Sequence, residues 1–225
     1  MAKNVARPKN IRFAVIATDI VVFRIVAGEL CVLLGKVNTS PYFINRWGVI
    51  GGLVLPKETV EKSAERLLQT KAGIGSMYKE QLYTFSSVDR DPRGRVVSVA
   101  HLGLAKESLR AGEGSMDIRW VSLRALPDLA YDHNEMVAMG LERLRARIGY
   151  TNIVQHLLPE TFTLSELQAL YEKVLNRKLD KRNFRKKVLK TRMIRKSGIM
   201  KKEGAMRPAA LYEFASKAVK TVQIL

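Results

Sequence analysis

Apolar positions in the first third of the chain predict strands followed by a helix. Two apolar runs, residues 11–26 and 30–34, flank the turn-forming segment 27–29, a pattern typical of an antiparallel hairpin. Residues 47–55, which contain two consecutive glycines, predict a strand and a glycine loop, and apolar residues then recur at helical spacing over residues 58–72. The expected order is hairpin, strand, glycine loop and helix.

Three more strands and a long helix are predicted before residue 150. Strands over residues 81–88 and 96–104 are separated by the turn-prone run 89–94, and residues 117–123 form another. Residues 134–148 place their apolar side chains on one stripe and arginines toward solvent, as in an amphipathic helix. The first part of the chain is therefore of the α/β class.

The C-terminal third has the element order of a winged helix-turn-helix domain. Thr163 and Glu166 have the spacing of a capping box, in which a hydroxyl and a carboxylate satisfy free backbone amides at a helix start. Asp180 can cap the helix that follows. Three helices and a basic hairpin in this order predict a winged helix. The helices are expected to start near residues 152, 164 and 181, and the strands to cover residues 193–195 and 209–214.

Length and composition favour two globular domains. A chain of 225 residues with 47% hydrophobic residues can bury two modest cores. We place the boundary at Gly149-Tyr150, which gives domains over residues 1–148 and 149–225. The single cysteine, Cys31, is expected to be a buried thiol, and no signal peptide or membrane span is expected. These features suit a reducing cytoplasm.

Positive charge is concentrated in the second domain. The net charge is +18, and residues 151–225 hold 17 lysines and arginines against 6 acidic residues. A basic domain of this kind is the electrostatic footprint expected of a nucleic-acid-binding protein.

One segment of the first domain resembles a known catalytic signature. The spacing Gly52-x5-Glu58-x7-Arg66-x6-Gly73-Ile74 is similar to the Nudix box, the loop-helix signature of enzymes that hydrolyse nucleoside diphosphates linked to another moiety. The resemblance implies an α/β/α sandwich with a mixed sheet.

The acids of that signature are missing. In active members Arg66 is followed by a glutamate, and two more glutamates stand three and four residues beyond it; here these positions are Leu67, Thr70 and Lys71. Magnesium needs hard oxygen ligands to bridge the diphosphate and generate a nucleophile. We therefore expect no catalytic residue, no metal ion, no cofactor and no hydrolase activity.

A pocket without catalytic acids can still bind a nucleotide. Guanidinium groups suit phosphate oxygens, and Trp47 offers an aromatic face to a base. Residues 89–95 alone would be a solvated hairpin loop, but they resemble a loop of ADP-ribose-type Nudix proteins. Asp132 and His133 fit a surface or capping pair better than a ligand site. The effector-binding candidates are Arg46, Trp47, Gly51, Gly52, Arg66, Arg90, Arg93 and Arg95.

The helix after Asp180 separates apolar from cationic side chains. A step of about 100° per residue places Phe184 and Val188 on one face and Arg182 and Lys186 on the other. Arginine can bond guanine, asparagine can bond adenine, and lysines suit phosphates. A solvated cationic helix is the alternative. The DNA-binding candidates are Arg182, Asn183, Arg185, Lys186 and Lys190 on the helix and Lys201, Lys202 and Arg207 on the hairpin.

Three segments of the second domain resemble one family. Residues 158–168, 180–186 and 207–212 are similar to the C-terminal domain of the Nudix-related transcriptional regulators, which join a Nudix-like domain to a winged helix. The resemblance implies a homodimeric repressor that binds a palindromic DNA operator in the cytoplasm, associated with the nucleoid. It also implies a role in NAD metabolism and an effector that is ADP-ribose, a related nucleotide or a sugar such as arabinose.

Two other functions are compatible with parts of the pattern. An active Nudix hydrolase with a basic substrate-delivery domain would need the acids that Leu67, Thr70 and Lys71 replace. An RNA-binding factor would show exposed aromatic residues on a sheet or a glycine-rich clamp, whereas Tyr171 and Phe184 occupy expected core positions. The ligand-controlled regulator is therefore the preferred hypothesis.

Overall fold

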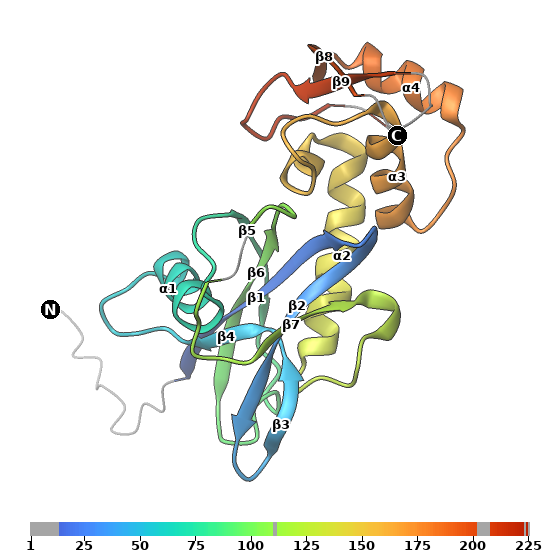
Figure 1. Ribbon diagram of the computed structural model, residues 1–225. Coiled ribbons are helices and arrows are strands. Elements are labelled where there is room, and N and C mark those ends of the chain that lie inside the picture. Colours follow the sequence, from blue (N-terminus) through green and yellow to red (C-terminus); the bar gives the residue numbers. More distant parts are fainter. Residues whose placement is uncertain (1–13, 110–111, 202–207, 223, 225) are drawn as a thin grey trace, which may run out of the picture.

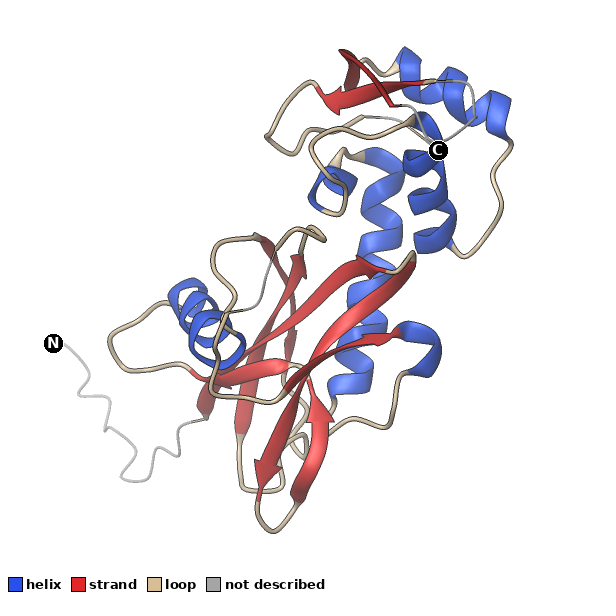
Figure 2. Ribbon diagram, in the orientation of Figure 1, coloured by secondary structure: helices blue, strands red, loops and turns tan. Residues whose placement is uncertain are grey.

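A seven-stranded mixed sheet forms the centre of the first domain in the computed structural model, which describes residues 14–109, 112–201, 208–222 and 224 (Figures 1 and 2). The strand order is β3-β2-β1-β6-β5, with β4 paired to β1 and β7 paired to β2. Strands β1 and β6 are parallel, and the other pairs are antiparallel. The strands are β1 (Val15–Val26), β2 (Glu29–Thr39), β3 (Phe43–Gly48), β4 (Ile50–Leu53), β5 (Tyr78–Phe85), β6 (Val96–Leu104) and β7 (Ile118–Ser122).

Helices cover both faces of this sheet. Along β1, Ile20 and Val22 pack with helix α1 (Val60–Ala72), while the alternating Val21 and Phe23 pack toward helix α2 (His133–Tyr150). This alternation follows from the two-residue period of a strand. The predicted α/β/α sandwich with a mixed sheet is confirmed.

The predicted glycine loop is wrong. Residues 47–55 were expected to form a strand and a glycine loop, but Gly51 and Gly52 belong to strand β4, and Val49 separates β4 from β3. The amide of Val49 donates to Nδ1 of His133, 3.1 Å away, so this residue bonds a side chain of α2. The short 3₁₀ helix η1 (Leu123–Ala125) follows β7.

The second domain has the predicted winged-helix order. It contains the 3₁₀ helix η2 (Ile153–His156), helices α3 (Leu164–Leu175) and α4 (Lys181–Lys190), and the hairpin of β8 (Ile194–Lys201) and β9 (Ala209–Phe214). Both halves of the capping box are present, because Thr163 Oγ1 accepts from the Glu166 amide and the Glu166 carboxylate accepts from the Thr163 amide. The Asp180 carboxylate caps α4 through the amide of Asn183.

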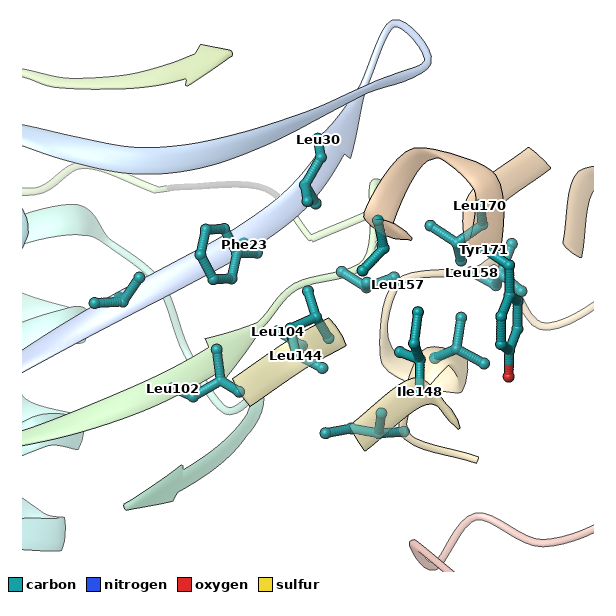
Figure 3. Packing of buried hydrophobic residues seen from close by; sticks show 14 of the residues in the cluster. Phe23, Leu30, Leu102, Leu104, Leu144, Ile148, Leu157, Leu158, Leu170 and Tyr171 are labelled. Atoms are coloured by element: carbon teal, nitrogen blue, oxygen red, sulfur yellow. The ribbon is translucent and has the colours of Figure 1, made fainter. Parts of the chain in front are cut away.

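Helix α2 belongs to the packing of both domains. Leu144 and Ile148, near its C-terminal end, lie in one buried cluster with Leu104 of the sheet and Leu157 of the second domain (Figure 3). One continuous hydrophobic cluster therefore runs through both domains. Within the described ranges, no helix is long and apolar enough to cross a membrane.

Candidate functional site

A cavity of about 470 Å³ opens beside the glycine strand β4. Its size falls within the range of small-molecule sites in proteins. It is walled by β1, β2 and β4, by the C-terminal half of α1, by the loop after β5 and by the start of α2. The lining residues are Ala17, Asp19, Lys36, Val37, Asn38, Thr39, Val49, Gly51, Gly52, Leu53, Lys71, Arg90, Asp91, Arg93, Val96, Met116, Tyr131 and His133.

Four of the eight effector-binding candidates line this cavity: Gly51, Gly52, Arg90 and Arg93. The glycines allow a close approach of strands and helix. A Cβ at Gly51 would overlap the carboxylate of Asp19, and one at Gly52 would press on Leu67. The side chains of Asp19 and Leu67 thus occupy the space that a Cβ at position 51 or 52 would need.

The other four candidates lie outside the cavity lining. Arg46 pairs with Asp128 at 2.6 Å, and Arg95 donates to two backbone carbonyls in the loop after β5. The Trp47 ring is occupied by two cations, with Lys36 Nζ 4.3 Å and Arg119 Cζ 5.2 Å from its centroid. The Trp47 ring thus packs against cations of the protein, outside the lining of this cavity.

Arg66, the fourth of these, fastens helix α1 to the loop before it. Its Nε and Nη2 donate to the two oxygens of Glu58 at 2.9 and 2.6 Å, and Nη2 also donates to the carbonyl of Leu53. Hydrogen bonding from Arg66 lowers the pKa of Glu58 to about 2. These two residues of the signature thus form an ion pair that links helix α1 to the loop before it.

The positions of the missing acids offer no metal ligands. Leu67 is 3% exposed and belongs to the core under α1, and Thr70 Oγ1 donates to the carbonyl of Arg66. Lys71 donates from Nζ to the carbonyl of Gly51 at 2.6 Å. Among the described residues, no group of three or more His, Cys, Asp or Glu side chains could hold a metal ion. The side chains at these positions do not fit the magnesium ion of a Nudix hydrolase.

Buried charges connect the cavity floor to the start of α2. Arg90 donates from Nε and Nη2 to the two oxygens of Asp132, both at 2.8 Å, and lies 3.6 Å from Asp19. Asp19 also accepts from Ser98 at 2.5 Å. Arg90 therefore ties α2 to β1, and any ligand that contacts it acts on both elements.

His133 is a second link between the cavity and α2. Its Nδ1 accepts from the amide of Val49, so Nε2 carries the proton and faces Asp19 Oδ1 at 3.7 Å. Burial lowers the pKa of His133, although Asp19 opposes the shift, and the ring is neutral. The sequence favoured a surface or capping role for His133, but the side chain is 4% exposed and lines the cavity.

An aromatic wall comes from a residue that the sequence did not single out. Tyr131 lines the cavity, with its hydroxyl 2.9 Å from Thr39 Oγ1 and its ring centroid 4.3 Å from that of Phe43. Arg93 lies over this ring at 5.9 Å and pairs with Asp91 at 2.7 Å. Nothing in the local pattern marks Tyr131, because its neighbours come from distant strands.

Helix α4 forms a candidate DNA interface. Phe184 and Val188 are buried, as the predicted stripe required, while Arg182, Asn183, Lys186 and Lys190 are exposed. Arg185 is half-buried and donates to Ser165 Oγ of α3 at 3.2 Å. The exposed face thus combines cations with an amide.

The hairpin candidates are placed only in part. Lys201, at the end of β8, pairs with Glu166 at the start of α3 at 2.9 Å. Lys202 and Arg207 lie outside the described residues. Lys201 therefore connects the hairpin to the first turn of α3, where the capping box lies.

A Nudix fold with a degenerate signature, joined to a winged helix, defines the class of Nudix-related transcription regulators. Residues 15–139 match the NUDIX domain, and residues 154–214 match the NrtR DNA-binding winged helix domain. The chain is 34% identical over 203 residues to the ADPR responsive transcriptional repressor NtrR of Acinetobacter baylyi, covering 88% of this chain and 80% of that protein. The chain belongs to the NrtR family.

Solved structures agree over both domains. The structure of Shewanella oneidensis NrtR complexed with a 27mer DNA is 29% identical, with a TM-score of 0.76, and the match covers 88% of this chain and 93% of that chain. The NUDIX domain of the same protein complexed with ADP ribose is 30% identical, with a TM-score of 0.55, covering 62% of this chain and 94% of that chain.

Proposed function

We propose that this protein is a DNA-binding transcription repressor that responds to ADP-ribose. The proposal is supported by the family of the chain and by relatives that were solved with DNA and with ADP ribose. The effector would bind in the cavity beside β4, contacting Gly51, Gly52, Arg90 and Arg93. The exposed face of α4, together with the hairpin, would bind the operator.

The observation that carries the proposal is the position of α2. His133 at its first turn lines the cavity, while Leu144 and Ile148 pack against the second domain. A ligand changes DNA affinity only through its differential affinity for two arrangements of the protein. A helix that contacts both the cavity and the winged helix can carry such a difference.

The first domain would bind its ligand without hydrolysing it. Leu67, Thr70 and Lys71 supply no carboxylate at the positions where hydrolases hold magnesium. Relatives that match over both domains include a transcriptional repressor and NrtR, which agrees with this assignment. An active hydrolase would need another set of oxygen ligands.

The proposed winged helix suggests both the form of the operator and the oligomeric state of the protein. A two-fold dimer presents two recognition helices, so a cytoplasmic homodimer would bind a palindrome whose half-sites lie about one helical turn apart or a multiple of it. We assign dimerisation and effector binding to residues 1–148 and DNA binding to residues 149–225. The proposed boundary falls at the last residues of α2.

A selection experiment tests this function. Duplexes that bind the full chain are selected from a random pool, and the affinity for the best duplex is measured by fluorescence anisotropy with and without ADP-ribose. We expect a palindromic duplex that is released by ADP-ribose and retained with AMP, which lacks the diphosphate. Release by a pentose alone would identify a sugar effector instead, and unchanged affinity with every ligand would overturn the proposal.

A further inference from the structure

Lys71 stands in the place of a metal-binding glutamate and reaches the wall of the cavity. It is the last of the three substituted signature positions, and it lies in the last turn of α1. Its ammonium donates to the carbonyl of Gly51 at 2.6 Å, at the strand that lines the cavity. A carboxylate here would attract a cation, whereas the lysine brings one.

The charges around the cavity do not cancel. Four cationic side chains line it, Lys36, Lys71, Arg90 and Arg93, and the carboxylates that line it or pair with its arginines are Asp19, Asp91 and Asp132. Both arginines are held in ion pairs with carboxylates. Lys36 and Lys71 instead bond the backbone carbonyls of Asn45 and Gly51, and neither makes an ion pair with a described carboxylate. One positive charge therefore remains in excess, and Lys36 and Lys71 are the two lining cations whose ammonium groups can turn to an anionic ligand.

A diphosphate bridge would be attracted by this excess of positive charge. Each phosphate of a diphosphate bridge carries one negative charge at neutral pH, and charge-assisted hydrogen bonds from ammonium groups to phosphate oxygens are strong. Burial lowers the pKa of Lys71 and nearby Asp19 raises it. An approaching phosphate would act in the same direction as Asp19 and favour the charged ammonium.

We infer that the Lys71 ammonium takes the place of the divalent cation of Nudix hydrolases, so that the cavity holds the diphosphate of its ligand without metal. The inference rests on the proposed function, because it concerns the same cavity and ligand. A metal ion both neutralises a diphosphate and generates the attacking hydroxide from its bound water. An ammonium neutralises the diphosphate but generates no hydroxide, so the ligand is bound and stays intact.

Isothermal titration of the full chain tests the inference with two probes, ADP-ribose and ADP. We expect the wild type to bind ADP-ribose equally in excess EDTA and in millimolar magnesium. Lys71→Met keeps the length of the side chain and removes its charge, and it should weaken binding about tenfold or more. Lys71→Arg should stay within a few fold of the wild type. Lys62→Met, an exposed change on the same helix, is the matched control and should bind like the wild type.

Thermal unfolding separates a binding effect from a folding effect. If Lys71→Met does not fold, Lys71→Gln replaces it, with the same loss of affinity expected. Wild-type binding that requires magnesium, or Lys71 variants that are folded and bind like the wild type, would overturn the inference. Metal-free, Lys71-dependent binding of ADP without binding of ADP-ribose would support Lys71 and overturn the proposed effector. Binding of neither probe would overturn both.

Discussion

Asp19 and Gly51 are register partners on the antiparallel strands β1 and β4, and they show how single residues shape the cavity. The Asp19 carboxylate occupies the space where a side chain of residue 51 would stand. The same carboxylate lies near Arg90 and His133, which join the cavity to α2. A side chain added at Gly51 would therefore displace the Asp19 carboxylate and disturb its interactions with Arg90 and His133.

Gly51→Ala should destabilise the protein and abolish ADP-ribose binding. The added Cβ displaces Asp19 from its partners, and overpacking of a well-packed site typically costs about 1–3 kcal/mol. Urea unfolding and calorimetry measure the two effects. Gly75→Ala is the control, because Gly75 is exposed and an added Cβ there has ordinary contacts. An alanine at 51 with wild-type stability and affinity would refute the assigned role of this contact.

The purified protein should not hydrolyse ADP-ribose in the presence of magnesium or manganese. The reason is the lack of ligands at Leu67, Thr70 and Lys71. Chromatographic detection of AMP after long incubation measures any turnover. Metal-dependent release of AMP that disappears in Glu65→Gln would show that the domain retains a catalytic site.

The sequence indicated which residue types could bind a phosphate, but it did not determine which of those residues line the cavity. Of the eight predicted effector-binding residues, two glycines and two arginines line the cavity beside β4. Arg46, Arg66 and Arg95 have the same chemistry, but their protein partners hold them outside the cavity lining. The partner of a guanidinium depends on which distant carboxylate or carbonyl the fold brings near it, and the local pattern does not contain this information.

At the level of elements, α4 uses one face for packing and leaves the other exposed. Phe184 and Val188 pack in the core of the second domain, and the exposed side carries Arg182, Asn183 and Lys186. Such a helix can enter a major groove because its apolar stripe is used for packing. The helical period alone predicted this division.

Arg182→Ala should reduce the preference of the protein for its selected duplex over random DNA. Loss of one base-reading arginine typically costs about 1–3 kcal/mol of discrimination. Competition binding with unlabelled random duplex measures it. Arg124→Ala removes an exposed arginine of the first domain, and it should leave the preference unchanged. Equal effects of the two changes would indicate that Arg182 contributes only general charge.

Elements with strong local signals were predicted well, and those that depend on distant partners were not. The capping box and the Asp180 cap located the starts of α3 and α4, because these hydrogen bonds are local. The break at Val49 between β3 and β4 was missed, because it depends on His133, which is far away in sequence. Strand β8 also runs to Lys201, beyond the predicted residues 193–195.

At the scale of the whole molecule, the two domains share a core. The continuous cluster through α2 joins the sheet to the winged helix, and Arg145 adds a hydrogen bond from its Nε to the carbonyl of Val174 in α3 at 2.9 Å. Packed elements of this kind shift between discrete arrangements rather than deforming gradually. Binding at the cavity and binding of DNA should therefore be coupled through α2.

Calorimetric titration of ADP-ribose into the free protein and into its complex with the selected duplex tests this coupling most directly. Thermodynamic linkage requires that DNA weaken ligand binding by the same factor by which the ligand weakens DNA binding, typically about 5- to 150-fold. We predict a weaker affinity in the complex, by the factor that anisotropy gives for the reverse effect. Equal affinity for ADP-ribose in the two titrations would contradict the account.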